Sequence, residues 1–327
     1  MTIKDIAEMA GVSVAAVSRY FNGGSLSEGK KRIIQKVVEE NNYVPNAMAQ
    51  TMRTGKSGNI GVIVPRVNSE SFAQIMAGIA SEVEENNYSV ILAVSENKQE
   101  KEVFYIEQME KSKMDGIILM GTVMTPYLKA AIEKCKIPVV VTGQDFEGIP
   151  SVFYDDKGAM CDITKLVLKK KKKLAYIGGP ENDIAVGKMR KAGVEKAMEE
   201  AGIDKKTLKA VESDFTLQGG YEAMKSILKM KGKVDGVICA TDRMAHGAMK
   251  AIREAGKKIP EDIAVVGVGD SWADVISSPQ LTTVHLYYDK CGHAAVMLLL
   301  AMIEHENNNR YISRVMLDYS IIERGSV

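Results

Sequence analysis

Cysteine, tryptophan and long apolar runs are scarce in this chain of 327 residues, which holds four cysteines and one tryptophan. The cysteines lie far apart, each within an apolar stretch, which argues against a metal motif or a disulfide framework and favours reduced core thiols. No apolar run approaches the ~18 residues of a membrane span, and the opening Met-Thr-Ile-Lys-Asp is not a signal peptide. We therefore expect a cytoplasmic protein with no membrane partner.

Motifs of catalysis are missing as well. The four histidines combine with no serine or aspartate at the spacing of a catalytic triad. The sequence has no zinc motif, no Walker loop and no dinucleotide fingerprint after a strand, because Gly267-Val268-Gly269 is too short to count. We therefore expect a protein that is not an enzyme and that carries no cofactor and no metal.

Positive charge is concentrated at one end of the chain. Residues 1–56 contain eight lysines and arginines against five aspartates and glutamates, whereas the whole chain has a net charge of only +1. A local basic excess suits contact with nucleic acid. Because the excess is small, useful affinity for DNA would need two copies of this segment on two half-sites.

The first 22 residues predict two short amphipathic helices joined by a tight turn. Gly11 stands where the chain must leave the first helix with positive φ, Val12 can fill the corner, and Ser13 is a good N-cap for the second helix. Apolar residues repeat at helical spacing on one face of each helix, namely Ile6, Ala7 and Ala10 in the first and Val14, Val17 and Phe21 in the second.

This arrangement is typical of a helix-turn-helix, which places its second helix in a DNA groove. Arg19 can bind guanine or a phosphate, polar side chains can bind phosphates, and small apolar ones can contact thymine methyl groups. The alternative is an ordinary helical hairpin with a solvated arginine. The candidate DNA-binding residues here are Thr2, Ser13, Val14, Ala15, Ser18, Arg19 and Asn22.

Two motifs then identify a family. The run T-I-K-D-I-A-x-x-A-G-V-S-x-x-x-V-S-R-x-x-N, followed by N-Y-x-P-N-x-x-A-Q, resembles the lactose-repressor family of bacterial transcription regulators. The resemblance implies a dimer whose hinge helices order on the operator and insert a leucine into the minor groove. Asn46 and Ala49 belong to this hinge, and Met52 occupies the leucine position, where it either inserts between base pairs or packs against the core.

Elementary physics supports such a hinge. Pro45 and Asn46 can start a helix and Gly55 can end it, but about two turns are too short to be stable alone. The segment should therefore fold only against DNA or a partner hinge. Ser27-Glu28-Gly29-Lys30-Lys31 departs from the Thr-Arg pair that caps the third helix in the family, a helix expected here over Lys30–Asn41.

From residue 59 onward, apolar strands alternate with amphipathic helices such as Phe72–Asn86 and Met244–Ala255. Nearly continuous apolar strands in this alternation predict parallel sheets covered on both faces, and about 270 residues of it predict two doubly wound lobes. The expected strands are Ile60–Val64, Val90–Val94, Gly116–Met120, Val139–Thr142, Leu174–Ile177, Val237–Ala240 and Ile263–Val268.

The predicted fold class is α/β, with an all-α helix-turn-helix headpiece and, as the resemblance implies, a two-lobed core like that of a periplasmic binding protein. We expect the headpiece over 1–45, a hinge helix and linker over 46–57, and an effector-binding and dimerisation core over 58–327. Lobe one is expected over about 58–160 and 289–320, and lobe two over about 161–288 and 321–327.

Ligands of such folds bind beyond the carboxyl ends of the strands. Arg190 matches the arginine of the R-x-x-G motif of the family and can hold sugar hydroxyls, unless it pairs with Glu195 or Glu181 at the surface. Asp242 lies in Thr-Asp-Arg-Met-Ala-His-Gly, close to the N-D-x-x-A-x-G motif of the family, and either accepts two hydroxyls or only caps its helix.

Other candidates are less specific. Val268 and Gly269 stand where relatives have an aromatic residue and an aspartate, so the carboxylate is expected to be shifted to Asp270. Trp272 offers a stacking surface for a sugar or anchors its loop, and Phe153 is either a ligand contact or a core aromatic. The full set of candidate effector-binding residues is Phe72, Gln144, Phe153, Arg190, Asp242, Asp270 and Trp272.

These features together predict a homodimeric transcriptional repressor of sugar-utilisation genes that binds a pseudo-palindromic operator and leaves it when a small sugar binds. Stretches such as Ala185–Lys188 resemble repressors of the sucrose and trehalose type, so a disaccharide is expected, sucrose ahead of trehalose. A corepressor- or partner-dependent regulator of carbon metabolism, or a sugar-binding protein without DNA function, is the alternative. The Lys169–Lys173 run is expected to be a solvated loop rather than a nucleic-acid patch.

Overall fold

The computed structural model describes residues 1–21, 23–43, 56–121, 123–304 and 313–327, which form two compact units. The first unit comprises residues 1–59 and 113–115. It contains the three headpiece helices α1 (Ile3–Met9), α2 (Val14–Phe21) and α3 (Glu28–Glu40). They enclose a small core of their own, made of Ile6, Ala7, Ala10, Ala16, Val17 and Ile34.

The turn between α1 and α2 follows the sequence prediction. Gly11 has a φ of +62°, and the Ser13 hydroxyl accepts a hydrogen bond from the backbone N–H of Ala16 at 3.3 Å. Val12 is half-buried against the headpiece core. The start of α3 differs from the expected Lys30, because this helix begins at Glu28 after an N-cap, Ser27, whose side chain makes no capping hydrogen bond.

The second unit, residues 60–112 and 116–327, contains two six-stranded sheets. The strands of the first sheet, in spatial order, are β11 (Arg314–Leu317), β5 (Ser151–Tyr154), β4 (Val139–Thr142), β3 (Gly116–Met120), β1 (Asn59–Val64) and β2 (Ser89–Val94). Those of the second sheet are β12 (Tyr319–Ile322), β10 (Thr282–Leu286), β9 (Ala264–Val268), β8 (Gly236–Cys239), β6 (Leu174–Gly178) and β7 (Lys209–Glu212). Each sheet is the centre of one lobe.

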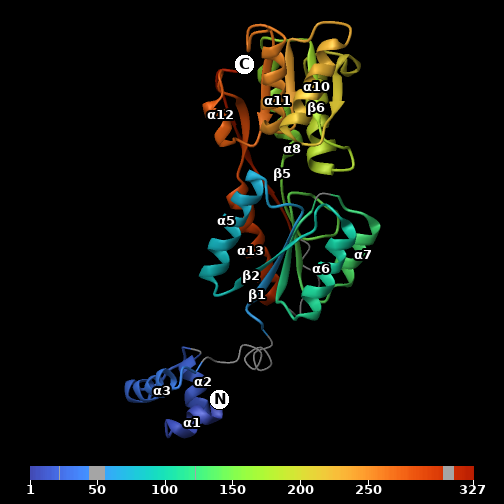
Figure 1. Ribbon diagram of the computed structural model, residues 1–327. Coiled ribbons are helices and arrows are strands. Elements are labelled where there is room, and N and C mark those ends of the chain that lie inside the picture. The colour runs from blue at the N-terminus through green and yellow to red at the C-terminus, as the bar shows by residue number, and fades with distance from the viewer. Residues whose placement is uncertain (22, 44–55, 122, 305–312) are drawn as a thin grey trace. The chain divides into compact units, whose positions relative to one another are not determined.

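Helices cover both faces of each sheet, as expected for buried parallel strands. In the first lobe, α5 (Glu70–Glu85) and α13 (Tyr288–Glu304) lie on one side of the sheet, and α6 (Gln99–Lys111) and α7 (Pro126–Lys134) on the other (Figure 1). In the second lobe the paired helices are α8 (Asp156–Leu168) with α9 (Arg190–Glu200) and α10 (Leu217–Lys229) with α11 (Asp242–Glu254). Three short helical segments complete it: η1 (Ile184–Met189), η2 (Lys205–Thr207) and α12 (Trp272–Ile276).

All seven expected strands are present, with ends within one residue of their predicted positions. The expected set does not include β5, β7, β10, β11 and β12. In β7, half-buried residues alternate with exposed ones, so this strand has no continuous apolar run. The expectation of purely parallel sheets is wrong at one edge, because β12 pairs antiparallel with β10.

The chain crosses between the lobes three times, near residues 155, 287 and 318. The expected boundary at residue 160 falls inside α8, which packs against α9 of the second lobe. The boundary near 320 falls inside β12, which belongs to the second sheet. The first crossing lies between the end of β5, at Tyr154, and the start of α8, at Asp156. The carboxyl end of β4, the parallel neighbour of β5, lies on the same edge of the first sheet.

Two glycines set the closeness of α5 and α13. A Cβ atom on Gly78 would lie 2.0 Å from the carbonyl oxygen of Asp289, and one on Gly292 would lie 2.2 Å from that of Ile75. Both distances are far below van der Waals contact, so only glycine allows the two backbones to approach this closely. This crossing fixes α13, whose first residue is Tyr288, relative to the first lobe.

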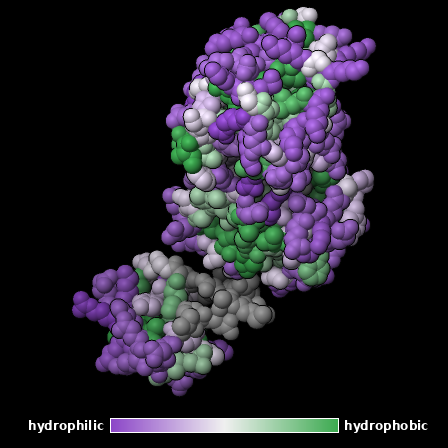
Figure 2. All heavy atoms as spheres, turned by 45° about the horizontal axis from the view of Figure 1, so that its top comes forward, coloured by the Kyte–Doolittle hydropathy of each residue, from purple (hydrophilic) through white to green (hydrophobic). Residues whose placement is uncertain are grey.

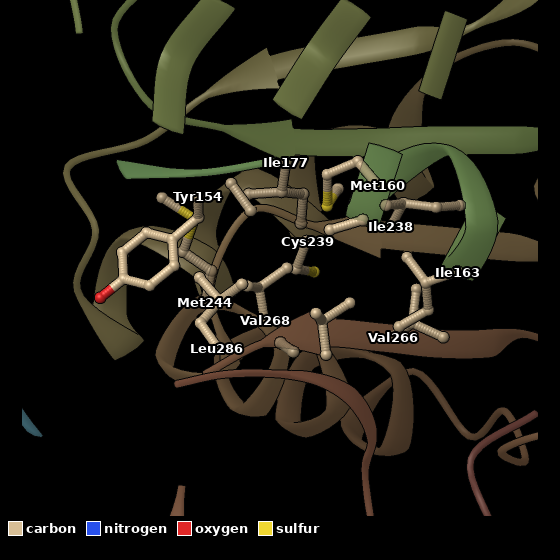
Figure 3. Close-up of a cluster of buried hydrophobic side chains, with 14 of the residues drawn as sticks. Tyr154, Met160, Ile163, Ile177, Ile238, Cys239, Met244, Val266, Val268 and Leu286 are labelled. Carbon is tan, nitrogen blue, oxygen red and sulfur yellow. The ribbon is translucent and has the colours of Figure 1, made fainter. Parts of the chain in front are cut away.

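The core of the second lobe is a continuous apolar cluster of side chains from its sheet and from α8 and α11 (Figure 3). Tyr154, the last residue of β5, lies at the edge of this cluster, and its hydroxyl points away from the other labelled side chains (Figure 3). All four cysteines are free thiols, three of them buried. No helix in the described ranges combines the length and the apolar character needed to cross a membrane.

Candidate functional site

The outer face of α2 presents side chains suited to a DNA groove. Val14 is 45% exposed, and Ala15 and Arg19 are exposed beside it, whereas Ala16 and Val17 are buried. The prediction that Val14 belongs to the inner apolar stripe is therefore wrong, because Ala16 takes that place. The separation of a buried small-residue face from an exposed face with an arginine is what a recognition helix requires.

The remaining DNA candidates differ in how they are used. The Thr2 hydroxyl accepts a hydrogen bond from Asp5 N–H at 3.3 Å, and the Asp5 carboxylate accepts one from Thr2 N–H at 2.7 Å, so Thr2 forms a capping box for α1. Ser13 caps α2, as described above, and Ser18 is half-buried. Four candidates, Asn22, Asn46, Ala49 and Met52, lie outside the described residues.

A cavity of about 530 Å³ opens between the two lobes of the second unit, at the carboxyl ends of their strands. This is the position that the doubly wound topology predicts for a ligand, and the volume suits a small molecule. The structure brings five of the seven effector candidates to its wall: Phe72, Gln144, Arg190, Asp242 and Trp272.

Arg190 forms a buried ion pair at the floor of this cavity. Its Nε donates to the Asp156 carboxylate at 2.6 Å, and its Nη1 donates to the carbonyl oxygen of Ala240. Neither Glu195 nor Glu181, the surface partners considered from the sequence, takes part. Burial raises the pKa of Asp156, and the adjacent guanidinium opposes that rise. The pair thus presents a fixed dipole to any molecule in the cavity.

Asp242 is buried on the same wall and does not cap its helix. Thr241 is the N-cap of α11, because its hydroxyl accepts a hydrogen bond from Met244 N–H at 3.3 Å. The Asp242 carboxylate instead accepts hydrogen bonds from the Thr283 hydroxyl at 2.6 Å and from Ser271 N–H at 3.2 Å. Burial, and then the nearby Asp274 carboxylate, raise the pKa of Asp242 well above its usual range.

A glycine makes room for this carboxylate. A Cβ atom on Gly267, in β9, would lie 2.2 Å from Oδ1 of Asp242. Thr283 and Ser271 each donate to one oxygen of Asp242 and so occupy two of the roughly four acceptor positions of its carboxylate, which leaves part of its hydrogen-bonding capacity for a ligand. The expectation that Asp242 accepts ligand hydroxyls therefore stays a prediction.

Gln144 connects the lobes across the inner end of the cavity and is only 2% exposed. Its Nε2 donates to the Asp183 carboxylate at 2.7 Å, and its Oε1 accepts a hydrogen bond from Ala185 N–H at 3.0 Å. Elsewhere on the wall, the Arg243 guanidinium donates to the carbonyl oxygen of Asn68 at 3.2 Å, which is a second link between the lobes. A ligand that moves the lobes must change one or both of these links.

Two hydroxyl groups on the wall of the first lobe lack partners. Thr142 Oγ1 and Tyr154 OH are buried, and neither has a nitrogen or oxygen hydrogen-bond partner among the described residues; the Cys291 thiol is the polar group near the Tyr154 hydroxyl. Leaving such groups unpaired costs about 1–3 kcal/mol each. They are the last residues of β4 and β5; Thr142 pairs with Val152, and Tyr154 lies two residues further along β5, so both side chains are on the same face at the carboxyl edge of the sheet. A bound molecule with hydrogen-bonding groups would satisfy both.

Apolar side chains provide the rest of the binding surface. Trp272 is 68% exposed at the first position of α12, so the alternative in which it anchors the loop by tucking into the lobe is not what the structure shows. The half-buried Phe72 and Phe215 and the exposed Leu217 also line the cavity. The combination of aromatic faces with a few buried polar groups is typical of sites for small polar molecules.

Two effector candidates are corrected. Phe153 is not on the cavity wall, because its ring lies under the Arg314 guanidinium, 5.9 Å from the ring centre. Asp270 is not there either, since its carboxylate pairs with Arg324 at 2.6 Å and with the His285 ring at 3.0 Å. Successive side chains of a strand point to opposite faces, so Tyr154 faces the cavity edge while its neighbour Phe153 faces away.

Several wall residues were not among the sequence candidates, namely Thr142, Tyr154, Asp156, Asp183 and Tyr288. Two of them, Thr142 and Tyr154, end β4 and β5, so a rule that takes the last polar residue of each buried strand would have found these two. The described residues contain no group of three histidine, cysteine, aspartate or glutamate side chains that could hold a metal ion.

Comparison with known proteins agrees with this division into a headpiece and a two-lobed core. Residues 2–46 match the family described as bacterial regulatory proteins, lacI family, and residues 163–327 match the periplasmic binding protein-like domain. Catabolite control protein A of Streptococcus mutans is 30% identical over 100% of this chain and 98% of its own length. The sucrose operon repressor of Staphylococcus xylosus is 30% identical over 93% of this chain and 94% of its own.

Solved structures show the same architecture. The lac repressor dimer bound to operator and the anti-inducer ONPF superposes with a TM-score of 0.89 and 25% identity, covering 100% of this chain and 98% of that one. The fold and these similarities define a transcription regulator with a helix-turn-helix, not an enzyme. The chain belongs to the lacI family of bacterial regulatory proteins, which confirms the family and the fold class predicted from its motifs.

Proposed function

We propose that the protein is a homodimeric repressor of sugar-utilisation genes, that it binds a pseudo-palindromic operator in the cytoplasm, and that a small sugar releases it. The observation that carries this proposal is the cavity between the lobes, which joins unpaired hydroxyls to aromatic faces in a chain with a recognition-helix face. The division into headpiece 1–45, hinge 46–57 and core 58–327 is part of the proposal.

The DNA contacts are assigned to α2 and the hinge. Arg19, Val14 and Ala15 reach base edges, Thr2, Ser13, Ser18 and Asn22 approach phosphates, and Asn46, Ala49 and Met52 act in the minor groove. The similarity to a lac repressor dimer solved on its operator supports this assignment. Two copies are also favoured by the edge strand β2, where Ile91 and Leu92 are 44% and 43% exposed and would be covered by a second subunit.

The effector is proposed to be a disaccharide, with sucrose ahead of trehalose. The 30% identity to a sucrose operon repressor supports this choice. Within the cavity, Thr142 and Tyr154 are proposed to bind sugar hydroxyls, Trp272 and Phe72 to contact the apolar faces of the rings, and Arg190 to contact a hydroxyl while it stays paired with Asp156. A coupling of only ~1–3 kcal/mol between the effector and DNA sites would change operator occupancy tenfold or more.

An operator titration tests the DNA half of the proposal. Full-length protein should bind a palindromic duplex from a randomised selection, and Arg19→Ala should weaken that binding by at least about tenfold, since one base or phosphate contact is lost in each half-site. Lys36→Ala, an exposed change on α3 outside the proposed contact set, is the control. No selection of any duplex by the wild-type protein would contradict the headpiece assignment.

The effector half is tested at the two unpaired hydroxyls. Thr142→Val and Tyr154→Phe each remove one hydroxyl, and each should weaken sugar binding by about tenfold in calorimetry, the equivalent of ~1–2 kcal/mol. Thr164→Val and Tyr176→Phe are matched controls, because their hydroxyls are also buried and unpaired but do not line the cavity. Equal losses in both pairs, or none in the first, would overturn the assignment of these hydroxyls.

A second candidate function is kept because one observation favours it. Catabolite control protein A is as similar to this chain as the sucrose repressor is. A regulator of that kind would bind its operator more tightly with a corepressor or a protein partner. The operator titration repeated with sucrose, trehalose and sugar phosphates separates the two functions, since an inducer weakens DNA binding and a corepressor strengthens it.

A further inference from the structure

Three loops rich in lysine meet at one edge of the second lobe. They are residues 169–173, 229–235 and 255–263, which precede β6, β8 and β9. These strands are parallel neighbours, so their starting ends share one edge of the sheet, opposite to the edge that carries the cavity. The sequence separates the three loops by some 60 and 20 residues, and only the fold unites them. We call this surface the lysine edge.

Contacts between the loops show that they are close. The Lys171 ammonium donates to the carbonyl oxygen of Glu261 at 2.8 Å, which joins the first loop to the third. Lys233 of the second loop and Lys257 and Lys258 of the third all act on one carboxylate, Asp262, whose pKa is lowered first by a hydrogen bond from Lys258 N–H and further by these charges. The three loops therefore form one surface.

The charge of this surface is strongly one-sided. It carries ten lysines, Lys169–Lys173, Lys229, Lys231, Lys233, Lys257 and Lys258, against three carboxylates, those of Asp235, Glu261 and Asp262. Nine of the lysines are exposed and Lys171 is half-buried. With this end of the lobe turned forward, Figure 2 shows a mostly hydrophilic surface.

The lysine charges are not neutralised locally. Within the described ranges, none of the ten ammonium groups lies within 4.0 Å of a side-chain carboxylate oxygen, and Lys170 donates to the main-chain oxygen of Val327 at 3.4 Å. Five other lysines of the same lobe do pair with side-chain carboxylates, namely Lys165, Lys191, Lys196, Lys225 and Lys250. Two of the three carboxylates are occupied by backbone N–H groups: Asp235 accepts from Lys172 and Lys173 at 3.0 and 2.7 Å, and Asp262 accepts from Lys258 at 2.8 Å. Ten like charges repel one another, so the surface favours a polyanion.

We propose that the lysine edge binds the phosphate backbone of double-stranded DNA without sequence preference. This departs from the sequence expectation of a solvated loop at Lys169–Lys173, because the fold adds five lysines from two other loops to that run. The three loops, 169–173, 229–235 and 255–263, contain no aromatic side chain, so they cannot stack on the bases of a single strand. They also contain no arginine, the residue whose forked side chain reads guanine. Of the large apolar side chains in these loops, Met230 alone is exposed, so the surface lacks the apolar centre of a protein interface. An exposed surface of lysines without aromatic, arginine or apolar recognition groups suits the regularly spaced phosphates of a duplex.

The consequence is a second DNA-contacting surface, carried by the core and independent of operator recognition by the headpiece. Each ammonium that neutralises a phosphate releases a counterion, so this contact would add to the salt dependence of binding any duplex. It would hold the protein near DNA that lacks an operator, or bind a second segment of duplex.

The test compares two charge-matched variants of the full-length chain. The edge variant changes five lysines to Gln together: Lys169, Lys173, Lys229, Lys231 and Lys233. None of these side chains has a hydrogen bond to another described residue. Binding to a labelled non-operator duplex is followed by fluorescence anisotropy over a salt series. The control changes Lys98, Lys101, Lys111, Lys134 and Lys136 of the first lobe to Gln, which gives the same net charge.

We expect the edge variant to bind the duplex at least about tenfold more weakly than the control at low salt, with a slope of log K against log salt that is smaller by up to ~4. Equal behaviour of the two variants would assign any effect to net charge and overturn the proposal. A second probe, poly-glutamate, tests whether the partner is an acidic protein. If the edge variant loses poly-glutamate binding but keeps its duplex binding, the proposal is also overturned. Thermal melting of both variants confirms that they are folded.

Discussion

Replacing Asp156 by alanine is expected to lower the free energy of unfolding by about 3–5 kcal/mol, the cost of leaving a buried charge without its partner. The Arg190 guanidinium cannot lose its proton at accessible pH, so it would stay charged in a cavity floor from which water is largely excluded. Urea unfolding at pH 7, followed by circular dichroism, measures the loss. The response of operator binding to sugar should disappear in the same variant.

The converse substitution should cost less. In Arg190→Met the remaining carboxylate can take up a proton, because burial already raises the pKa of Asp156 and the opposing guanidinium is gone. Its destabilisation should therefore be smaller at pH 5 than at pH 7, since a carboxyl with a raised folded-state pKa favours the folded state at low pH and loses that contribution as the pH rises. The double variant Asp156→Leu with Arg190→Met should regain most of the stability.

An exposed pair supplies the control for this series. Arg314 and Asp145 form an ion pair whose side chains are 46% and 34% exposed, and Asp145→Ala should cost no more than ~1 kcal/mol. If Asp156→Ala cost as little as Asp145→Ala, water would have to reach the cavity floor, and the account of a desolvated pair would be wrong.

A methyl group at the crossing of α5 and α13 should be the next most damaging change. In Gly78→Ala the new Cβ atom would lie 2.0 Å from the Asp289 carbonyl oxygen, so the helices must separate, at a cost of about 1–3 kcal/mol or more. Because this contact is with backbone, no side-chain rotation can relieve it. Urea unfolding of the full-length chain measures the loss.

The crossing also positions the cavity, so the same change should weaken sugar binding. Glu70 and Phe72 at the start of α5 and Tyr288 at the start of α13 all line its wall. Gly29→Ala in α3 is the control, since a Cβ atom there meets nothing within 4 Å and alanine favours helix by up to ~1 kcal/mol over glycine. A Gly78→Ala protein as stable as the wild type would show that the two helices can separate freely.

Local patterns were sufficient for the headpiece and for most of the core. Gly11, Ser13 and the apolar spacing of Ile6, Ala7 and Val17 fix the helix-turn-helix, because a turn and its caps depend on neighbouring residues. Continuous apolar runs located seven strands to within one residue, because strands buried on both faces need apolar side chains throughout. Short strands without such a run, such as β7, carry no such signal.

The sequence placed candidate residues on the cavity wall correctly where a family motif follows a strand end. It placed them wrongly where the tertiary fold decides which way a side chain points. Arg190 lies on the cavity wall as its motif indicates, but its partner is Asp156, 34 residues earlier in the chain. Asp270 and Phe153 are close in sequence to wall residues and point elsewhere, since a strand or a turn reverses side-chain direction from one residue to the next.

By itself, the sequence determined the family, the helix-turn-helix and the alternation of strands and helices, because these depend on residues near one another in the chain. Only the tertiary structure decided which groups meet. It placed the hydroxyls of Thr142 and Tyr154 on one cavity wall, hydrogen-bonded the Asp242 carboxylate to Thr283, and gathered lysines from three loops at one edge. Such encounters depend on strand order and on the packing of helices, which no local spacing of residues specifies.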